Sequence, residues 1–331
     1  MFIHRRQRHR PQDGQETPRD VAMHRRAWLR TAGLALGGAA LVGGVWQSQR
    51  VWKGNDIDVV ERGRINSQFA TKLSTEFFPA CRDERFAYDR DETPRAAAAR
   101  HTNFFEFSTT KAVWRYVRSF QPHPWTLRIG GLCRSPLDLN LEEFLRRYRD
   151  HLVERQYRLR CVERWAMAIP WVGIPLSRVL RDVDPLHAAS HVRFTSFERP
   201  EEASRQSDPS YPWPYTEGLT IAEAKIDLVL LAVGMYGEPL LKQHGAPLRL
   251  VVPWKYGYKS IKSIEHIELV DREPSTFWST LDPLSYPFVS NVDPQGTVPW
   301  RQDSERMLGT GESFPTQAFN GYGNEVATLY L

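Results

Sequence analysis

The sequence predicts an α+β fold in which mixed sheets are joined by short helices. Short segments that alternate apolar and polar residues, as strands do, are interspersed with short segments of helical periodicity. The two kinds do not alternate regularly, as they would in a doubly wound parallel sheet. The chain has 331 residues, 41% of them hydrophobic, which is enough for one large core or two closely packed ones.

Residues 1–50 contain many arginines, and the pair Arg25-Arg26 precedes a mildly apolar run, 31–46, that is rich in Gly and Ala. This pattern resembles a twin-arginine export signal, so we expect a periplasmic protein. The run is short for a stable membrane span, although a retained N-terminal anchor stays open. Because the arginines of this region account for most of the formal charge of +5, the charge does not indicate a nucleic-acid partner.

Residues 51–95 are polar, weakly periodic and interrupted by prolines, which predicts an extended arm or linker before a main domain over 96–331. Within that domain, 125–129 alternates and ends in two glycines, as a strand does. Asn140 and Glu143 form a capping-box pattern that predicts the start of a helix.

Residues 156–161 alternate again and predict a strand. One face carries Tyr157, Leu159 and Cys161, and the other carries Gln156, Arg158 and Arg160. Cys161 therefore points inward at the end of the strand. A short helix should follow from Pro175, with one apolar stripe formed by Leu176, Val179, Leu180 and Val183.

Four further strands are expected, at 192–196, 228–233, 248–252 and 264–270. Thr220 and Glu223 form a second capping-box pattern. Residues 200–218 hold four prolines and predict a long loop, a feature that is often functional.

The chain has three cysteines, Cys81, Cys133 and Cys161. Cys81 could pair with Cys133 and leave Cys161 as a ligand, or all three could be free. A thiolate is a soft metal ligand. We expect Arg158, Arg160 and Arg164 to favour the thiolate of Cys161, the alternative being a small core residue.

A second candidate segment runs from His244 to Ile264 and carries four cations, Arg249, Lys255, Lys259 and Lys262, around glycine-rich turns. Backbone N–H groups and cations of such a loop suit a phosphate or a pyranopterin, the alternative being a solvated basic loop. The sequence has no Cys-x-x-Cys or His-Glu-x-x-His pair for zinc and no Gly-x-Ser-x-Gly nucleophile turn.

Several segments together resemble the catalytic subunits of bacterial periplasmic protein-methionine-sulfoxide reductases. The segments are the arginine pair, NFFEF from Asn103, RLRCVERW, MAIPWVGIPL, HGAPLRLVVPWKYGYKSIKSI and FNGY from Phe319. The resemblance covers most of the chain. It implies a sulfite-oxidase-type molybdopterin-binding fold with one molybdenum per chain.

The resemblance also implies roles for single residues. Cys161 would bind molybdenum, and the remaining positions would contact the pterin. These are Thr102, Asn103, Phe105, Glu106, Ser196, His244, Arg249, Ser260, Ile261 and Lys262. Two positions depart from the family's pattern, since His244 replaces a common Asn and Phe105 replaces a common Tyr. The chain also ends, at Leu331, before a tail that is common in the family.

The implied function is reduction of methionine sulfoxide in periplasmic proteins, with electrons from a haem-containing membrane subunit and the quinone pool. No Cys-x-x-Cys-His haem motif is present, which fits an external donor. Glu163 is a candidate proton relay, unless it is an ion-paired surface residue. The loop at 211–215 is a candidate mouth for protein substrates, unless its aromatic residues serve packing.

Two kinds of alternative stay open. Another reaction on the same cofactor, such as sulfite oxidation or reduction of small sulfoxides, would use the same site. A cofactor-free periplasmic binding module would not contain molybdenum.

Overall fold

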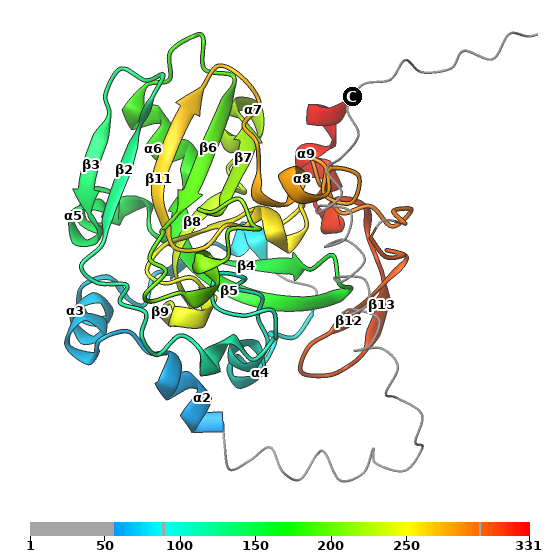
Figure 1. Cartoon of the computed structure of the whole chain (residues 1–331), viewed down its shortest axis with the longest axis horizontal. Coiled ribbons are helices and arrows are strands. Elements are labelled where there is room, and N and C mark those ends of the chain that lie inside the picture. The colour runs from blue at the N-terminus through cyan, green and yellow to red at the C-terminus, as the bar shows by residue number, and fades with distance from the viewer. Residues whose placement is uncertain (1–55, 88–89, 298) are drawn as a thin grey trace, which may run out of the picture. The chain divides into compact units, whose positions relative to one another are not determined.

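The computed structural model describes residues 56–87, 90–297 and 299–331 (Figure 1). This part of the chain forms two sheets with short helices around them, so the α+β prediction is confirmed. The export signal predicted over residues 1–50 lies outside the described residues. Among the described residues, no helix is both long and apolar enough to span a bilayer.

One sheet has five strands. Their order is β3 (Leu137–Asn140), β2 (Thr126–Gly131), β11 (Ile264–Val270), β6 (His191–Ser196) and β7 (Thr216–Thr220). Only β2 and β11 pair in parallel. One face of this sheet is apolar and enters the core through Leu127, Ile129 and Phe194, while the other carries polar side chains, as expected for a sheet packed on one side.

The other sheet has eight strands. Its main path is β1 (Cys81–Arg82), β4 (Val153–Arg160), β5 (Trp165–Pro175), β12 (Ser304–Met307) and β13 (Ser313–Pro315). A branch from β5 adds β8 (Leu230–Met235), β9 (Glu238–Pro239) and β10 (Arg249–Val251). β4 and β5 form an antiparallel hairpin. Its turn lies at the end of the domain where β12, β13, α8 and α9 gather (Figure 1).

The helices are short. They are α2 (Asp56–Gly63), α3 (Ser67–Phe77), α4 (Arg95–Arg100), α5 (Leu141–Arg147), α6 (Leu176–Val183), α7 (Ile221–Ala224), α8 (Phe277–Leu281) and α9 (Gly323–Val326). Both predicted capping boxes form, at the N-termini of α5 and α7. The predicted apolar stripe of α6 is fully buried.

The segment expected to be an extended arm differs from that expectation. Over 56–77 it contains α2 and α3, and Asn66 caps α3 by accepting from the backbone N–H of Gln68. Three apolar residues at helical spacing, Phe69, Leu73 and Phe77, are buried in the main core. The polar residues between them concealed this spacing. Burial of three large side chains stabilises the helix by several kcal/mol, at about 1.5–3 kcal/mol each.

Candidate active site

Cys161 lies in the turn between β4 and β5 and is 5% exposed. The turn is closed by a backbone hydrogen bond from Arg164 to Cys161. The loop around Gly257 packs against it, since a Cβ on Gly257 would lie 3.5 Å from the carbonyl oxygen of Arg160 and 4.0 Å from Cys161 Cα. The structure thus brings together the two segments that the sequence marked as halves of one site.

A polar group surrounds the sulfur. Asn103 Nδ2 lies 3.5 Å from Cys161 Sγ, and Glu163 Oε2 lies 3.8 Å from it. Lys111 Nζ is 2.5 Å from Glu163 Oε2 and donates to Asn103 Oδ1 at 2.6 Å. Trp165 Nε1 also donates to Glu163. The sequence did not indicate Lys111, because its two partners come from different segments of the chain.

Of the three arginines predicted to favour the Cys161 thiolate, Arg160 does so, but burial outweighs it. Burial, together with the nearby Glu163 carboxylate, raises the pKa of the Cys161 thiol to about 12. Arg160 acts in the opposite direction but more weakly. A bound metal ion would supply the positive charge that the arginines do not, since a coordinating thiol loses its proton.

Arg160, predicted on the strand face opposite Cys161, is fully buried. The C-terminal segment covers that face, and Arg160 donates to Gln302 Oε1 at 2.9 Å and forms an ion pair with Glu305 at 3.3 Å. Arg160 also donates to the carbonyl oxygen of Cys161, and Gln302 donates to that of Val162 at 2.8 Å. The backbone on both sides of the sulfur is therefore held by the last part of the chain.

The two ends of the second segment, around Gly245 and around Lys262, are packed tightly together. Gly245 has φ +93°, and a Cβ there would lie 2.6 Å from Lys262 Cβ, so only glycine fits. Ser263 Oγ donates to the carbonyl oxygen of Ala246 at 2.7 Å, and Ser196 Oγ donates to that of Lys262 at 2.8 Å. These bonds place the predicted pterin contacts from three separate elements side by side.

Two of the four cations that were predicted to bind an anion form ion pairs inside the protein instead. Lys255 Nζ lies 2.6 Å from Glu223 Oε1, and Lys259 Nζ lies 2.6 Å from Glu217 Oε2. All four side chains are almost fully buried. These lysines are neutralised inside the protein, so the prediction that they provide charge for an anion is wrong.

Arg249 and Lys262, the other two cations, form no such ion pair within the described residues. Arg249 donates to the carbonyl oxygens of His244 and Ser260, at 3.0 and 3.1 Å, and forms no ion pair with a carboxylate of the described residues. Lys262 is half-buried, and its ammonium has no hydrogen bond or ion pair within the described part of the chain. Burial, together with the charge of Arg249, lowers the pKa of Lys262 to about 7.

The Glu106 carboxylate, which is 2% exposed, acts on the charge of Lys262. Burial raises the pKa of Glu106 to about 7, with Lys262 opposing the rise. The region therefore holds two cationic groups and a single carboxylate that burial disfavours in its charged form. An anionic group bound here would relieve this imbalance.

The remaining predicted contacts lie around this region or in the core. Thr102 Oγ1 donates to the carbonyl oxygen of Gln243 at 3.4 Å. Burial, with help from Arg249, lowers the pKa of His244 to about 3, so its ring is neutral. Ser260 Oγ accepts from the N–H of Val252 at 3.1 Å, and the Ile261 side chain is buried in the main core.

Phe105 and the 211–215 loop form an aromatic cluster. The ring of Phe105 packs on Tyr211 and Trp213, with centroids 5.0 and 6.0 Å apart. Tyr215 stacks on Phe277 at 4.7 Å and donates to the carbonyl oxygen of Tyr258. Aromatic packing, one of the two alternatives for this loop, is what the structure shows.

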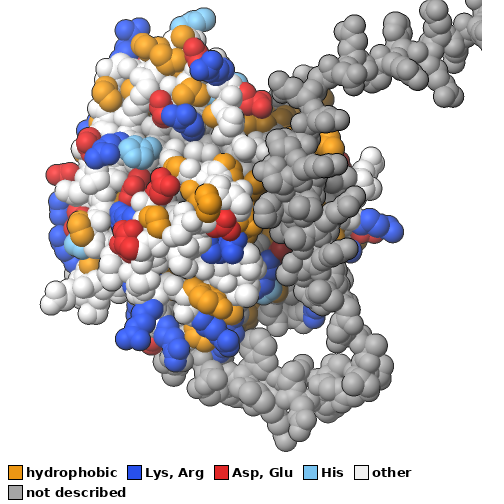
Figure 2. Space-filling model, in the orientation of Figure 1, with side chains coloured by type: hydrophobic (Ala, Val, Ile, Leu, Met, Phe, Trp, Pro, Cys, Tyr) orange, Lys and Arg blue, Asp and Glu red, His pale blue; other side chains and the backbone are white. Residues whose placement is uncertain are grey.

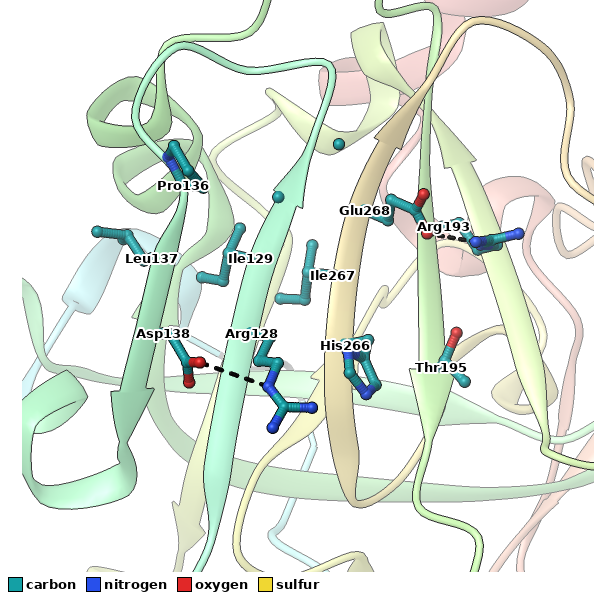
Figure 3. Close-up of a pocket in the computed structure, with 12 residues that line it drawn as sticks. Arg128, Ile129, Pro136, Leu137, Asp138, Arg193, Thr195, His266, Ile267 and Glu268 are labelled. Carbon is teal, nitrogen blue, oxygen red and sulfur yellow. Dashed lines mark hydrogen bonds and ion pairs between the residues drawn. The ribbon is translucent and has the colours of Figure 1, made fainter.

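A shallow hollow of about 620 Å³ lies elsewhere, on the outer face of the five-stranded sheet (Figure 3). Its charged side chains form surface ion pairs, Arg128 with Asp138 and Arg193 with Glu268. Figure 2 shows basic and acidic side chains interspersed over this face. Exposed pairs of this kind contribute little energy, and none of the residues predicted for the site lines the hollow.

The cysteine turn and the Arg249–Lys262 region together fit a molybdopterin. Such a cofactor has a metal end that takes a soft ligand and a phosphate end that takes cations. The Cys161 sulfur affects the pKa of Lys262, so the two groups are close enough to interact. The described residues include no group of three or more His, Cys, Asp and Glu side chains placed to hold a metal ion. All three cysteines are free.

Comparison with known proteins agrees with this chemistry. Residues 114–278 match the oxidoreductase molybdopterin binding domain. A protein-methionine-sulfoxide reductase catalytic subunit MsrP of Gluconobacter oxydans is 42% identical over 97% of this chain and 95% of its own. The chain belongs to this family. Its enzymatic nature and its sulfite-oxidase-type fold follow from that membership, and a cofactor-free binding module does not fit it.

Two further relatives bear the same name. That of Xanthomonas axonopodis pv. citri is 47% identical over 70% of this chain and 73% of its own, and that of Burkholderia mallei is 39% identical over 95% and 91%. The sulfane dehydrogenase SoxCD of Paracoccus pantotrophus is a distant structural match, with a TM-score of 0.38 and 18% identity over 60% of this chain and 46% of its own.

Proposed function

We propose that this enzyme reduces methionine sulfoxide in proteins, using one molybdenum per chain held by a molybdopterin and Cys161. The observation that carries the proposal is the meeting of a buried thiol with a region of uncompensated positive charge, Arg249 and Lys262. Membership in the family of methionine-sulfoxide reductase catalytic subunits supports the choice of substrate.

The position of each residue indicates its role toward the cofactor. The cofactor, when bound, supplies the acceptor for the sulfoxide oxygen and the two-electron change. Cys161 would hold the metal end, while Arg249 and Lys262 would bind the phosphate end. Asn103, 3.5 Å from the sulfur, would orient groups beside the metal.

Glu163 and Lys111 are placed to handle protons. Burial alone would raise the pKa of Glu163, but the Lys111 ammonium and the hydrogen bonds from Asn103 and Trp165 together hold that pKa below its usual range. The Glu163 carboxylate is therefore ionised and can accept a proton, with Lys111 Nζ 2.5 Å away. Glu163 Oε2 lies 3.8 Å from the Cys161 sulfur, so a proton could pass between Glu163 and a group beside the sulfur through one water.

The wider setting is also part of the proposal. The twin-arginine pattern in residues 1–50 would export the folded enzyme to the periplasm. Its substrates there would be oxidised periplasmic proteins. Electrons would come from a haem-containing membrane subunit, and the relatives' description as catalytic subunits supports a separate partner.

The central test is Cys161→Ala, expressed in a host that makes molybdopterin. We expect loss of molybdenum, measured by elemental analysis, and loss of sulfoxide reduction, while circular dichroism shows a folded protein. Full activity in this variant would contradict the assignment of Cys161. Parallel assays with peptide methionine sulfoxide, a small sulfoxide and sulfite separate the proposed reaction from the two alternatives on the same cofactor.

A further inference from the structure

A short segment beside the site has an unusual surface. In residues 283–289, the exposed side chains are Pro283, Leu284, Pro287 and Val289, and none of them is polar. Leu284 is 82% exposed and Val289 is 42% exposed. Among the described residues, the other large hydrophobic side chains this exposed are Tyr116 and the terminal Leu331. Single exposed apolar residues are ordinary, but a segment next to a site whose fully exposed side chains are all apolar indicates a contact surface.

The segment is fixed to the loop that covers Cys161. Lys255 Nζ donates to the carbonyl oxygen of Val289 at 2.6 Å, and the N–H of Tyr256 donates to that of Ser290 at 3.1 Å. Gly257, the next residue of this loop, packs against the cysteine turn. The apolar segment is therefore an ordered wall beside the site.

Tyr286 is the residue of the 283–289 segment that packs inward, toward the site. Its ring packs on Tyr258 and Trp278, with centroids 5.1 Å apart in each pair. It belongs to the same buried cluster as Cys161. The segment thus turns one side chain toward the thiol and its apolar neighbours toward solvent.

We propose that the 283–289 segment is the docking surface for the polypeptide on either side of the methionine sulfoxide. This inference rests on the proposed function. Oxygen transfer requires the sulfoxide to reach the metal, and an extended chain covers about 3.3 Å per residue. The residues within about three positions of the sulfoxide must then lie within about 10 Å of it, over the surface that borders the site. The uncharged 283–289 segment favours substrates with apolar residues beside the methionine sulfoxide, because contact between them removes apolar area from water.

A partner that delivers electrons is the other candidate for this surface. Electrons do not require the donor to touch the residues that border the metal, whereas oxygen transfer requires contact. The position of the segment therefore favours the substrate.

The test is the double variant Leu284→Asp with Val289→Asp, compared with the wild-type holoenzyme. Reduced viologen serves as the electron donor, so partner docking does not enter the measurement. The substrates are a pentapeptide with methionine sulfoxide between leucines, one with methionine sulfoxide between serines, and free methionine sulfoxide. We expect the KM for the leucine peptide to rise about tenfold, which is about 1.4 kcal/mol, with kcat and the kinetics of free methionine sulfoxide unchanged.

Tyr116→Asp is the matched control, because it places a charge on another exposed large side chain outside the segment, 49% exposed. Leu284→Gln with Val289→Thr serves as a milder pair if the aspartates impair folding. Equal changes for all three substrates, or no change for any, would overturn the docking surface while leaving the proposed function intact. A wild-type enzyme that reduces none of them would instead contradict the proposed function, and the docking surface with it.

Discussion

Two pairs of cations in the segment from His244 to Ile264 differ in whether they form buried ion pairs. Lys255 and Lys259 each form a buried ion pair with a glutamate. Neither Arg249 nor Lys262 forms an ion pair among the described residues, and burial disfavours the charged form of Glu106, the carboxylate that acts on Lys262. The first pair holds the loop in place, and the second leaves positive charge directed at the site.

This difference shows that the number of cations in a segment does not locate an anion site. What locates it is the absence of an internal counter-charge, because a buried charge without a partner costs several kcal/mol unless a ligand neutralises it. Lys259 and Lys262, one member of each pair, should therefore respond differently to substitution.

The largest effect is expected for Lys259→Met. It leaves the Glu217 carboxylate, 0% exposed, without its cation. We expect the free energy of unfolding to fall by about 3–5 kcal/mol, measured by urea denaturation. The double variant Lys259→Met with Glu217→Gln should recover most of the loss. A loss below about 1 kcal/mol, typical of exposed pairs, would show that this pair does not differ from a surface ion pair.

Lys262→Ala should act on the cofactor and not on the fold. Its ammonium has no ion pair within the described chain, so the free energy of unfolding of the cofactor-free protein should stay the same or rise. We expect retention of molybdopterin to weaken about tenfold, or about 1.4 kcal/mol, measured as metal content after dialysis. Lys225→Ala, an exposed lysine on the surface, is the control.

Arg249→Ala should lower metal content as well. It also leaves the carbonyl oxygens of His244 and Ser260 without their donor, so a loss of stability should accompany it. If Lys262→Ala lowered stability as much as Lys259→Met does, the distinction between the two pairs would be wrong.

A pH-dependent effect concerns His244, whose pKa is lowered in part by Arg249 and Lys262. Burial lowers its pKa to about 3, against about 6.5 in an unfolded chain. Between these values the unfolded state binds a proton that the folded state does not, so this group makes the protein less stable as the pH falls below about 6.5. The slope is at most about 1.4 kcal/mol per pH unit.

His244→Asn should reduce this slope, as measured by urea denaturation at pH 7 and pH 5. Asparagine keeps a hydrogen-bonding side chain but does not titrate. His101, whose pKa burial lowers to about 4, contributes a slope of the same sign and stays in both proteins. Identical slopes in the variant and the wild type would show that the ring of His244 is protonated in the folded state.

Much of this fold could be predicted from local patterns. The strands near 125, 156, 192 and 264, the two capping boxes and the stripe of α6 all follow from the spacing of residues within one element. The sequence did not predict α2 and α3, because polar residues separate their few apolar residues. The three apolar residues of α3 are recognised as one buried face only once the core that they contact is known.

By itself, the sequence determined that a thiol ends a strand, that a glycine-rich cationic loop follows later, and that both resemble one enzyme family. Only the tertiary structure decided which charges were available, since Glu217, Glu223 and Lys111 reach their partners from distant segments. It also placed Arg160 inside the protein, beneath a C-terminal segment that no local pattern connects to it. The physical reason is that strand and helix periodicity depends on near neighbours, whereas the neutralisation of a buried charge depends on whichever residue the fold places beside it.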